Sequence, residues 1–281
     1  MDSTEKNSVI TPRKRILDLQ LKEIWNYRDL FLLFIKRDIT ITYKQTLLGP
    51  LWFFIQPIFT TLMFLLVFGR IAGIPTDGVP APLFYLSGLT IWNYFSDCLR
   101  LTSDTFVKNA GIFGKIYFPR IITPISVVSS NLVKFAIQFI LFIGVFFFYL
   151  LKGAQIQPNI TLILLPLYIL ILAVMSLGFG LIISSMTTKY RDFVFLIQFG
   201  IQLWMYATPI IYPMSQIPEK YRWIIMINPV SSIVESFKYG FTGSGSFNLN
   251  SILYSGTFSI ILFFISLAVF NRTEKTFMDT V

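Results

Sequence analysis

The sequence predicts an all-α integral membrane protein that crosses the bilayer six times, and three observations support this fold class. Hydrophobic residues make up 54% of the 281-residue chain and charged residues only 13%, which is far more apolar than a soluble domain. Six nearly uncharged runs approach the roughly 20 residues that a helix needs to cross the hydrocarbon core. Seventeen of the 23 Lys and Arg residues fall on one side of these runs. Because basic loops stay cytoplasmic, both termini are expected inside.

The expected spans are residues 47–69, 82–103, 135–151, 160–185, 193–212 and 251–270. The third run is the shortest, and we interpret Lys134 and Lys152 at its ends as snorkelling anchors. An alternative is that Lys134 couples transport to an ion. Residues 1–11 lack a signal-peptide pattern, so the first span is expected to direct insertion. We divide the chain into a cytoplasmic N-terminus (1–46), a transmembrane domain (47–271) and a cytoplasmic tail (272–281).

Residues 29–46 mix apolar and basic residues in the way expected of an N-terminal amphipathic helix that lies in the membrane interface. The alternative is an ordinary juxtamembrane flank. The first span should begin sharply at Gly49-Pro50, because Pro suits the first turn of a helix.

The cytoplasmic loop 104–123 combines three cations with apolar and aromatic residues, which a simple connection does not need. We therefore predict that it is a docking surface. Its exposed apolar residues are expected to be Ile112, Phe113, Ile116, Tyr117 and Phe118.

The outer segment 208–245 is too long and too apolar for a solvated loop, and four prolines prevent one continuous helix. We predict two short re-entrant helices, at about 221–227 and 228–241, beside a water-accessible cavity, since non-helical backbone at this depth must be covered by protein or water. Glu235 and Lys238 are spaced as a local ion pair. Asp97 and Arg100 are interpreted in the same way.

No catalytic or metal site is expected. The chain has one cysteine and no histidine, so multi-cysteine metal sites and histidine base chemistry are excluded. The net charge of +9 is explained by basic cytoplasmic loops beside anionic lipid rather than by nucleic-acid binding.

Four segments carry a family resemblance when read in order: RDITITYKQTLLGPLWFFIQP (37–57), NAGIFGKIYFPRIITP (109–124), RDF (191–193) with WMYATPIIYP (204–213), and INPVSSIVESFKYGFTG (227–243). Together they resemble the permease subunit of bacterial polysaccharide ABC exporters of the type-2 class, most of all the O-antigen exporters. The resemblance covers the chain from about residue 21 onward.

The resemblance implies a homodimer in the bacterial cytoplasmic membrane with two ATP-binding cassette subunits beneath it, which bind ATP and Mg. No cofactor is then expected in this chain, and it has no G-x-x-x-x-G-K-[ST] phosphate-binding loop of its own. The segment 109–119 would be a coupling helix that docks on the ATPase, and the outer region 213–245 would form a gate. The implied coupling residues are Asn109, Ile112, Phe113, Lys115, Tyr117, Phe118 and Pro119, and the gate residues are Tyr221, Ile225, Asn228, Pro229 and Ser232.

The implied substrate is a polysaccharide on a polyprenyl diphosphate lipid. Sugar rings pack on aromatic planes, so aromatic side chains suit a channel that holds a glycan weakly, although each ring alone is as well explained by lipid contact or helix packing. The channel candidates are Phe53, Phe54, Phe59, Trp92, Tyr94, Phe95, Trp204 and Tyr206. Cations that could bind the diphosphate, or simply anionic membrane lipids, are Arg28, Lys36, Arg37 and Lys44.

Other functions remain open at this point. Teichoic acid and capsule exporters share the layout. An ion-coupled secondary transporter would place ionisable residues near the midplane, where only Asp97 comes close. A membrane-embedded enzyme would need clustered acids, bases or metal ligands. An ATPase gene beside this one would favour export.

Overall fold

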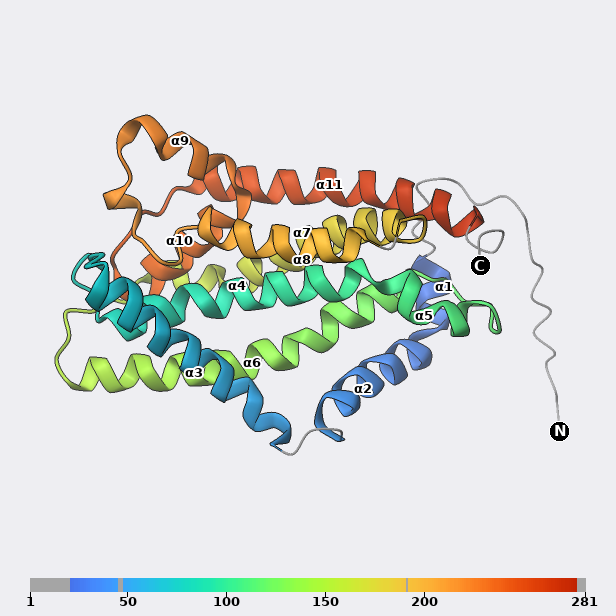
Figure 1. Ribbon diagram of the computed structural model, residues 1–281, viewed down its shortest axis with the longest axis horizontal. Helices are drawn as coiled ribbons and strands as arrows, with labels where there is room; N and C mark the ends of the chain where they lie inside the picture. Colours follow the sequence, from blue (N-terminus) through green and yellow to red (C-terminus); the bar gives the residue numbers. More distant parts are fainter. Residues whose placement is uncertain (1–20, 45–47, 191, 277–281) are drawn as a thin grey trace.

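The computed structural model describes residues 21–44, 48–190 and 192–276, and every regular element among these residues is a helix (Figure 1). The amphipathic N-terminal region is formed by α1 (Leu21–Asn26) and α2 (Arg28–Lys44). The regions expected to span the membrane contain η1 (Gly49–Leu51), α3 (Trp52–Phe64), the π-helix η2 (Leu65–Ile71), α4 (Ala81–Ser103), α6 (Ile122–Leu151), η3 (Ile160–Leu164), α7 (Leu165–Thr187), α8 (Phe193–Tyr206) and α11 (Leu249–Thr276). The shorter connecting helices are α5 (Thr105–Phe113), η4 (Met214–Gln216), α9 (Glu219–Ile227) and α10 (Pro229–Thr242).

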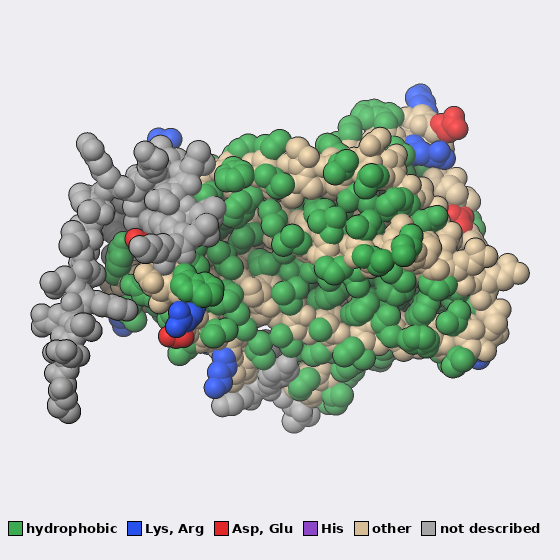
Figure 2. Space-filling view, turned by 180° about the vertical axis from the view of Figure 1, so that it is seen from behind, with side chains coloured by type: hydrophobic (Ala, Val, Ile, Leu, Met, Phe, Trp, Pro, Cys, Tyr) green, Lys and Arg blue, Asp and Glu red, His purple; other side chains and the backbone are tan. Residues whose placement is uncertain are grey.

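Among the described residues, four helical stretches are long and apolar enough to cross a membrane. They are Gly49–Ile71, Ile122–Leu151, Ile160–Thr187 and Leu249–Glu274. Figure 2 agrees with this, because hydrophobic side chains cover the middle of the visible face and charged side chains lie toward its two ends. The chain is therefore a multi-pass membrane protein, and six crossings in total remain a prediction.

Helix α4 is the central helix of the bundle. It packs against α3, α6, α7 and α10, and most of its residues are buried. Neighbouring helices thus shield many of its polar residues, among them Asp97 at 15% exposure. This burial explains why α4 is less apolar than the four stretches above.

Close packing joins α4 to α7. A Cβ built on Gly180 of α7 would lie 1.8 Å from the Thr102 Oγ1 and 2.5 Å from the Thr102 Cβ. Small residues at such contacts let two helix backbones approach each other inside a membrane. Gly178 lies against Leu262 of α11 in the same way, so α7 holds α4 and α11 together.

Two predicted span boundaries are wrong. Helix α6 begins at Ile122 rather than at residue 135, because the charge of Lys134 is neutralised inside the bundle by Asp97 and does not have to mark a membrane boundary. Helix α8 ends at Tyr206 rather than at residue 212. The reason is Pro209, which lacks an amide donor and disfavours helical backbone in the residue before it.

The described ends of the chain lie at one end of the bundle. Figure 1 shows α1, α5 and the last turns of α11 together, with α9 at the opposite end. The Arg120 Nη1 donates to the Glu274 carbonyl oxygen at 3.1 Å, which joins the loop after α5 to α11. Residues 1–20 and 277–281, parts of the predicted cytoplasmic segments, lie outside the described residues, and the cytoplasmic placement of this end stays a prediction.

The contact at Gly180 predicts a position-specific cost. Gly180→Ala should destabilise the protein by about 1–3 kcal/mol, because the short Thr102 side chain cannot move its own Cβ away without a backbone shift. Gly200→Ala on α8 is the matched control, since nothing lies within 4 Å of its added Cβ. Thermal unfolding in detergent measures both, and equal melting temperatures for the two variants would contradict the tight α4–α7 contact.

Candidate functional site

A basic pocket lies where α2, α3, α4, α5 and α6 meet, with a volume of about 520 Å³. Four cations face it together with two carboxylates and several apolar side chains. Its lining is Arg37, Asp38, Ile39, Ile41, Phe53, Asp97, Arg100, Leu101, Thr105, Lys108, Asn109, Ile112, Val127, Ser130, Asn131, Val133 and Lys134. Charged and apolar groups thus share one cavity, as a site for an amphiphilic anion requires.

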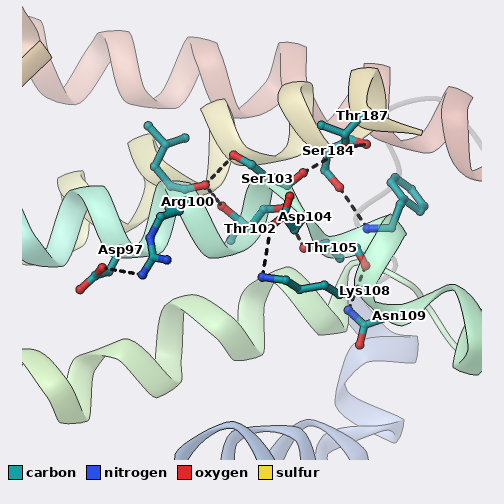
Figure 3. Close-up of polar contacts among 12 residues, drawn as sticks. Asp97, Arg100, Thr102, Ser103, Asp104, Thr105, Lys108, Asn109, Ser184 and Thr187 are labelled. Carbon is teal, nitrogen blue, oxygen red and sulfur yellow. Dashed lines mark hydrogen bonds and ion pairs between the residues drawn. The ribbon is translucent and has the colours of Figure 1, made fainter. Parts of the chain in front are cut away.

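One carboxylate in this pocket is shared by two cations. Asp97 forms an ion pair with the Lys134 ammonium. It also accepts from the Arg100 Nη2 at 3.2 Å (Figure 3). The Asp97 and Lys134 side chains are only 15% and 21% exposed, whereas Arg100 is 48% exposed. The predicted local pair between Asp97 and Arg100 is confirmed, and Lys134 is a member of a pocket network rather than a boundary anchor.

Helix α2 contributes Arg37 to the pocket. Its guanidinium pairs with Asp38 at 2.8 Å, donates to the Asn109 Oδ1 at 3.4 Å and lies 4.7 Å from the centre of the Phe34 ring. Burial raises the pKa of Asp38, and Arg37 opposes that rise. Arg37 is therefore fixed between α2 and α5.

Of the other predicted diphosphate ligands, Arg28 and Lys36 are exposed outside the pocket, and the Lys44 side chain lies outside the described residues. Sequence reasoning missed Arg100, Lys108 and Lys134 as pocket cations. The spacing of Arg100 after Asp97 was visible in the sequence, but the approach of Lys134 depends on how α4 and α6 pack.

Hydrogen bonds fix the junction of α4 and α5 to α7 (Figure 3). The Phe106 N–H donates to the Ser184 Oγ at 3.2 Å, and the Thr187 Oγ1 donates to the Ser103 carbonyl oxygen at 3.1 Å. The Lys108 ammonium pairs with Asp104 at 3.1 Å. Movement of this junction relative to α7 therefore requires the two buried bonds of Ser184 and Thr187 to break.

The predicted coupling helix is displaced along the chain. Helix α5 covers Thr105–Phe113, and residues 114–121 form turns instead of continuing the predicted helix 109–119. Gly114 is the C-cap of α5, and glycine is a weak helix former, which favours this early end. Pro119 lies within the turns, and the helix contains Asn109 and Ile112.

The predicted exposure of the loop aromatics is wrong for two of them. Phe113 and Phe118 are each 3% exposed, because their rings pack on one another at 5.7 Å, with Phe118 also against Phe34 of α2 and Phe113 against Phe106 of α5. Lys115, Ile116 and Tyr117 are exposed, the last two at 61% and 59%. These three residues form what we call the loop tip.

Three channel candidates lie in the core of the bundle. Trp92, Tyr94 and Phe95 are at most 3% exposed, and Phe95 packs edge-on against Trp204 at 5.2 Å. These three rings therefore face no surface of the single chain. In this conformation of the single chain they do not line a channel for the glycan. The role stays a prediction for the candidates that are partly or fully exposed, Phe53, Phe54, Phe59, Trp204 and Tyr206.

Two short helices are present in the predicted segment as α9 and α10, and their re-entrant placement at the outer side stays a prediction. Pro229 is the first residue of α10, and the Asn228 side chain caps it by accepting from the Val230 N–H at 3.1 Å. Most residues of α9 are exposed, Tyr221 among them, whereas most of α10 is buried. Ile225 and Ser232 are half-buried. The more weakly packed helix of the pair is therefore α9.

The charges of Glu235 and Lys238 interact as predicted, but the two side chains form no direct salt bridge with each other. The Lys238 ammonium instead donates to the Pro209 carbonyl oxygen at 2.5 Å and lies 3.6 Å from the centre of the Phe84 ring. Lys238 thus joins α10 to α4 and to the chain after α8.

Comparison with known proteins identifies the family. The ABC-2 type transporter family matches residues 29–242, which is most of the chain. The chain belongs to the ABC-2 type transporter family. This ABC-2 family member is 28% identical over 253 residues to the O-antigen export system permease protein RfbA of Klebsiella pneumoniae, covering 89% of this chain and 94% of the relative.

More distant relatives of this ABC-2 family member carry similar names. The RfbA permease of Myxococcus xanthus is 24% identical over 265 residues, covering 93% of this chain and 98% of the relative. The polysialic acid transport protein KpsM of Escherichia coli is 21% identical over 251 residues, covering 87% of this chain and 93% of the relative. These similarities extend over nearly the whole chain, so they include both the basic pocket and the loop tip.

The cap at Asn228 predicts a stability difference between two asparagines. Asn228→Ala removes the α10 cap and the bond from the Asn228 Nδ2 to the Thr208 Oγ1 at 2.9 Å, and it should destabilise the protein by about 1–3 kcal/mol. The control is Asn248→Ala, which removes an exposed bond to the Asn250 N–H and should cost less than about 1 kcal/mol. Thermal unfolding measures both, and a larger loss for Asn248→Ala would contradict this account of α10.

Proposed function

We propose that this chain is the membrane permease subunit of an ATP-driven exporter, and that it moves a lipid-linked polysaccharide across the bacterial cytoplasmic membrane. The observation that carries the proposal is the match to O-antigen export permeases over about nine-tenths of the chain. The multi-pass helical bundle supports it. O-antigen on polyprenyl diphosphate is the proposed cargo.

Capsular polysaccharide is the second candidate cargo. The similarity to the KpsM protein of Escherichia coli favours it, although the identity to that relative is lower than to the RfbA proteins. Teichoic acid exporters remain a third possibility within the proposed class, from the sequence resemblance alone.

ATP hydrolysis is assigned to separate subunits. The sequence contains no phosphate-binding loop of the G-x-x-x-x-G-K-[ST] type, so ATP is proposed to bind to two separate ATP-binding cassette subunits. The proposed assembly contains two copies of this chain, as the family resemblance implies. The loop tip is the proposed contact with the ATPase, because Ile116 and Tyr117 are exposed apolar side chains at the end of the bundle that holds α1 and α5.

The glycan path is proposed to lie between two copies of the chain. Helices α3 and α8 expose large apolar side chains, among them Phe59 at 64% and Phe199 at 61%. These surfaces can pack against a second copy of the chain, contact lipid or contact the sugar rings of the glycan. At the outer end, α9 is proposed as the moving part of the gate because it is exposed, and α10 as its fixed base.

Export in a deletion strain tests the proposal. The chain and its neighbouring ATPase should together restore surface O-antigen to a strain that lacks its own permease and ATPase and makes the matching glycan. The permease alone should restore none, and a catalytically inactive ATPase should abolish the effect. Export by the permease alone would contradict the proposal.

The loop tip gives a sharper prediction. Tyr117→Asp places a charge in the proposed ATPase interface and should reduce co-purified ATPase at least tenfold, while the melting temperature of the permease stays unchanged because Tyr117 is 59% exposed. Tyr190→Asp is the control, since Tyr190 is similarly exposed at 55% and follows α7. ATPase recovery unchanged by Tyr117→Asp would reject the loop tip as the contact.

A further inference from the structure

The basic pocket combines features that a simple salt-bridge cluster does not need. Its volume of about 520 Å³ exceeds what a few bridging waters would occupy. Its lining carries four cations against two carboxylates, and Asp104 beside the lining pairs with Lys108, which leaves an excess of one positive charge. Phosphate groups are favoured partners for such converging Lys and Arg side chains.

The pocket also has an apolar side at the start of the first predicted span. Ile39 and Ile41 of α2 and Phe53 of α3 line it, and Ile41 is 53% exposed. The neighbouring Trp52 at the beginning of α3 is 47% exposed. A ligand with its head among the cations could therefore extend an apolar tail along α3 into the lipid.

The cations reach the pocket from four separate helices. Arg37 comes from α2, Arg100 from α4, Lys108 from α5 and Lys134 from α6. Two of them already share an internal anion, because Asp97 holds both Lys134 and Arg100. An incoming phosphate must compete with this carboxylate for the same two side chains.

We propose that the basic pocket binds the diphosphate of a polyprenyl diphosphate lipid, with Asp97 as the internal anion that the diphosphate displaces from Lys134 and Arg100. This inference rests on the proposed function, because it assigns the lipid end of the exported glycan to a site. When the lipid diphosphate binds, Lys134 and Arg100 move from Asp97 to the phosphates. When the two cations pair with Asp97 again, release of the lipid is favoured. Asp97 thus limits the affinity of the pocket for the lipid diphosphate and prevents the lipid from remaining bound.

Ligand binding to the purified permease–ATPase complex in neutral detergent tests the site, with farnesyl diphosphate as the probe. Calorimetry should show binding of farnesyl diphosphate at least tenfold tighter than that of farnesol or inorganic pyrophosphate, because only the diphosphate lipid uses both halves of the pocket. Dioleoyl phosphatidylglycerol, tested in the same way, should also bind at least tenfold more weakly. Equal binding of phosphatidylglycerol and farnesyl diphosphate would overturn the assignment in favour of a general site for anionic lipid.

Variants of the pocket separate its two sides. Replacing both Arg100 and Lys134 by Gln should weaken farnesyl diphosphate binding at least tenfold, and Lys134→Arg should retain it. Lys152→Gln is the matched control, because Lys152 directly follows the same helix at its far end and is exposed. Asp97→Asn should strengthen binding several-fold and slow the ATP turnover that lipid-linked glycan stimulates.

The Asp97→Asn variant keeps the proposal testable if the double variant does not fold. Affinity that is unchanged or weaker in folded Asp97→Asn protein would overturn the displacement of Asp97 by diphosphate. Normal glycan export together with unchanged binding in the double variant would overturn the pocket while leaving the proposed function intact. Tight, pocket-dependent farnesyl diphosphate binding without any export would support the pocket and reject the proposed function instead.

Discussion

A charge in the interior of a membrane protein needs a partner, and the pairing of Asp97 on α4 is the interaction on which much of this structure depends. A carboxylate at this position is tolerated because Lys134 reaches it from α6 and Arg100 from the next turn of α4. The same pairing keeps α4 and α6 in contact and leaves their polar faces on one cavity. Helix α4 can therefore be largely buried and still contribute Asp97 and Arg100 to the basic pocket.

Close packing connects that pocket to the end of the bundle. Gly180 lets α7 approach α4, and bonds from Ser184 and Thr187 of α7 fix the turn at which α5 begins. The rings of Phe113 and Phe118 then fill the space beneath the loop tip. Helix α5 thus contributes Lys108 to the basic pocket and ends at the loop tip, so the two features share one helix.

The sequence predicted the helical membrane class and the two short helices α9 and α10, because each depends on local composition or on the prolines that interrupt the segment. It failed where packing decides the outcome. The charge of Lys134 suggested a span boundary, yet a partner from another helix allows the residue to lie inside α6. The aromatic residues of the loop looked exposed, yet Phe113 and Phe118 pack under it. Three of the four pocket cations were missed because four helices bring them together.

The most direct measurement of the central claim is ATP-dependent movement of lipid-linked O-antigen in proteoliposomes that contain this chain and its ATPase. The glycan is added on the ATPase side, and its appearance on the other side is followed with a membrane-impermeant lectin. The account predicts accumulation that requires ATP, the ATPase and this chain together. Equal accumulation without ATP, or with liposomes that lack this chain, would contradict it.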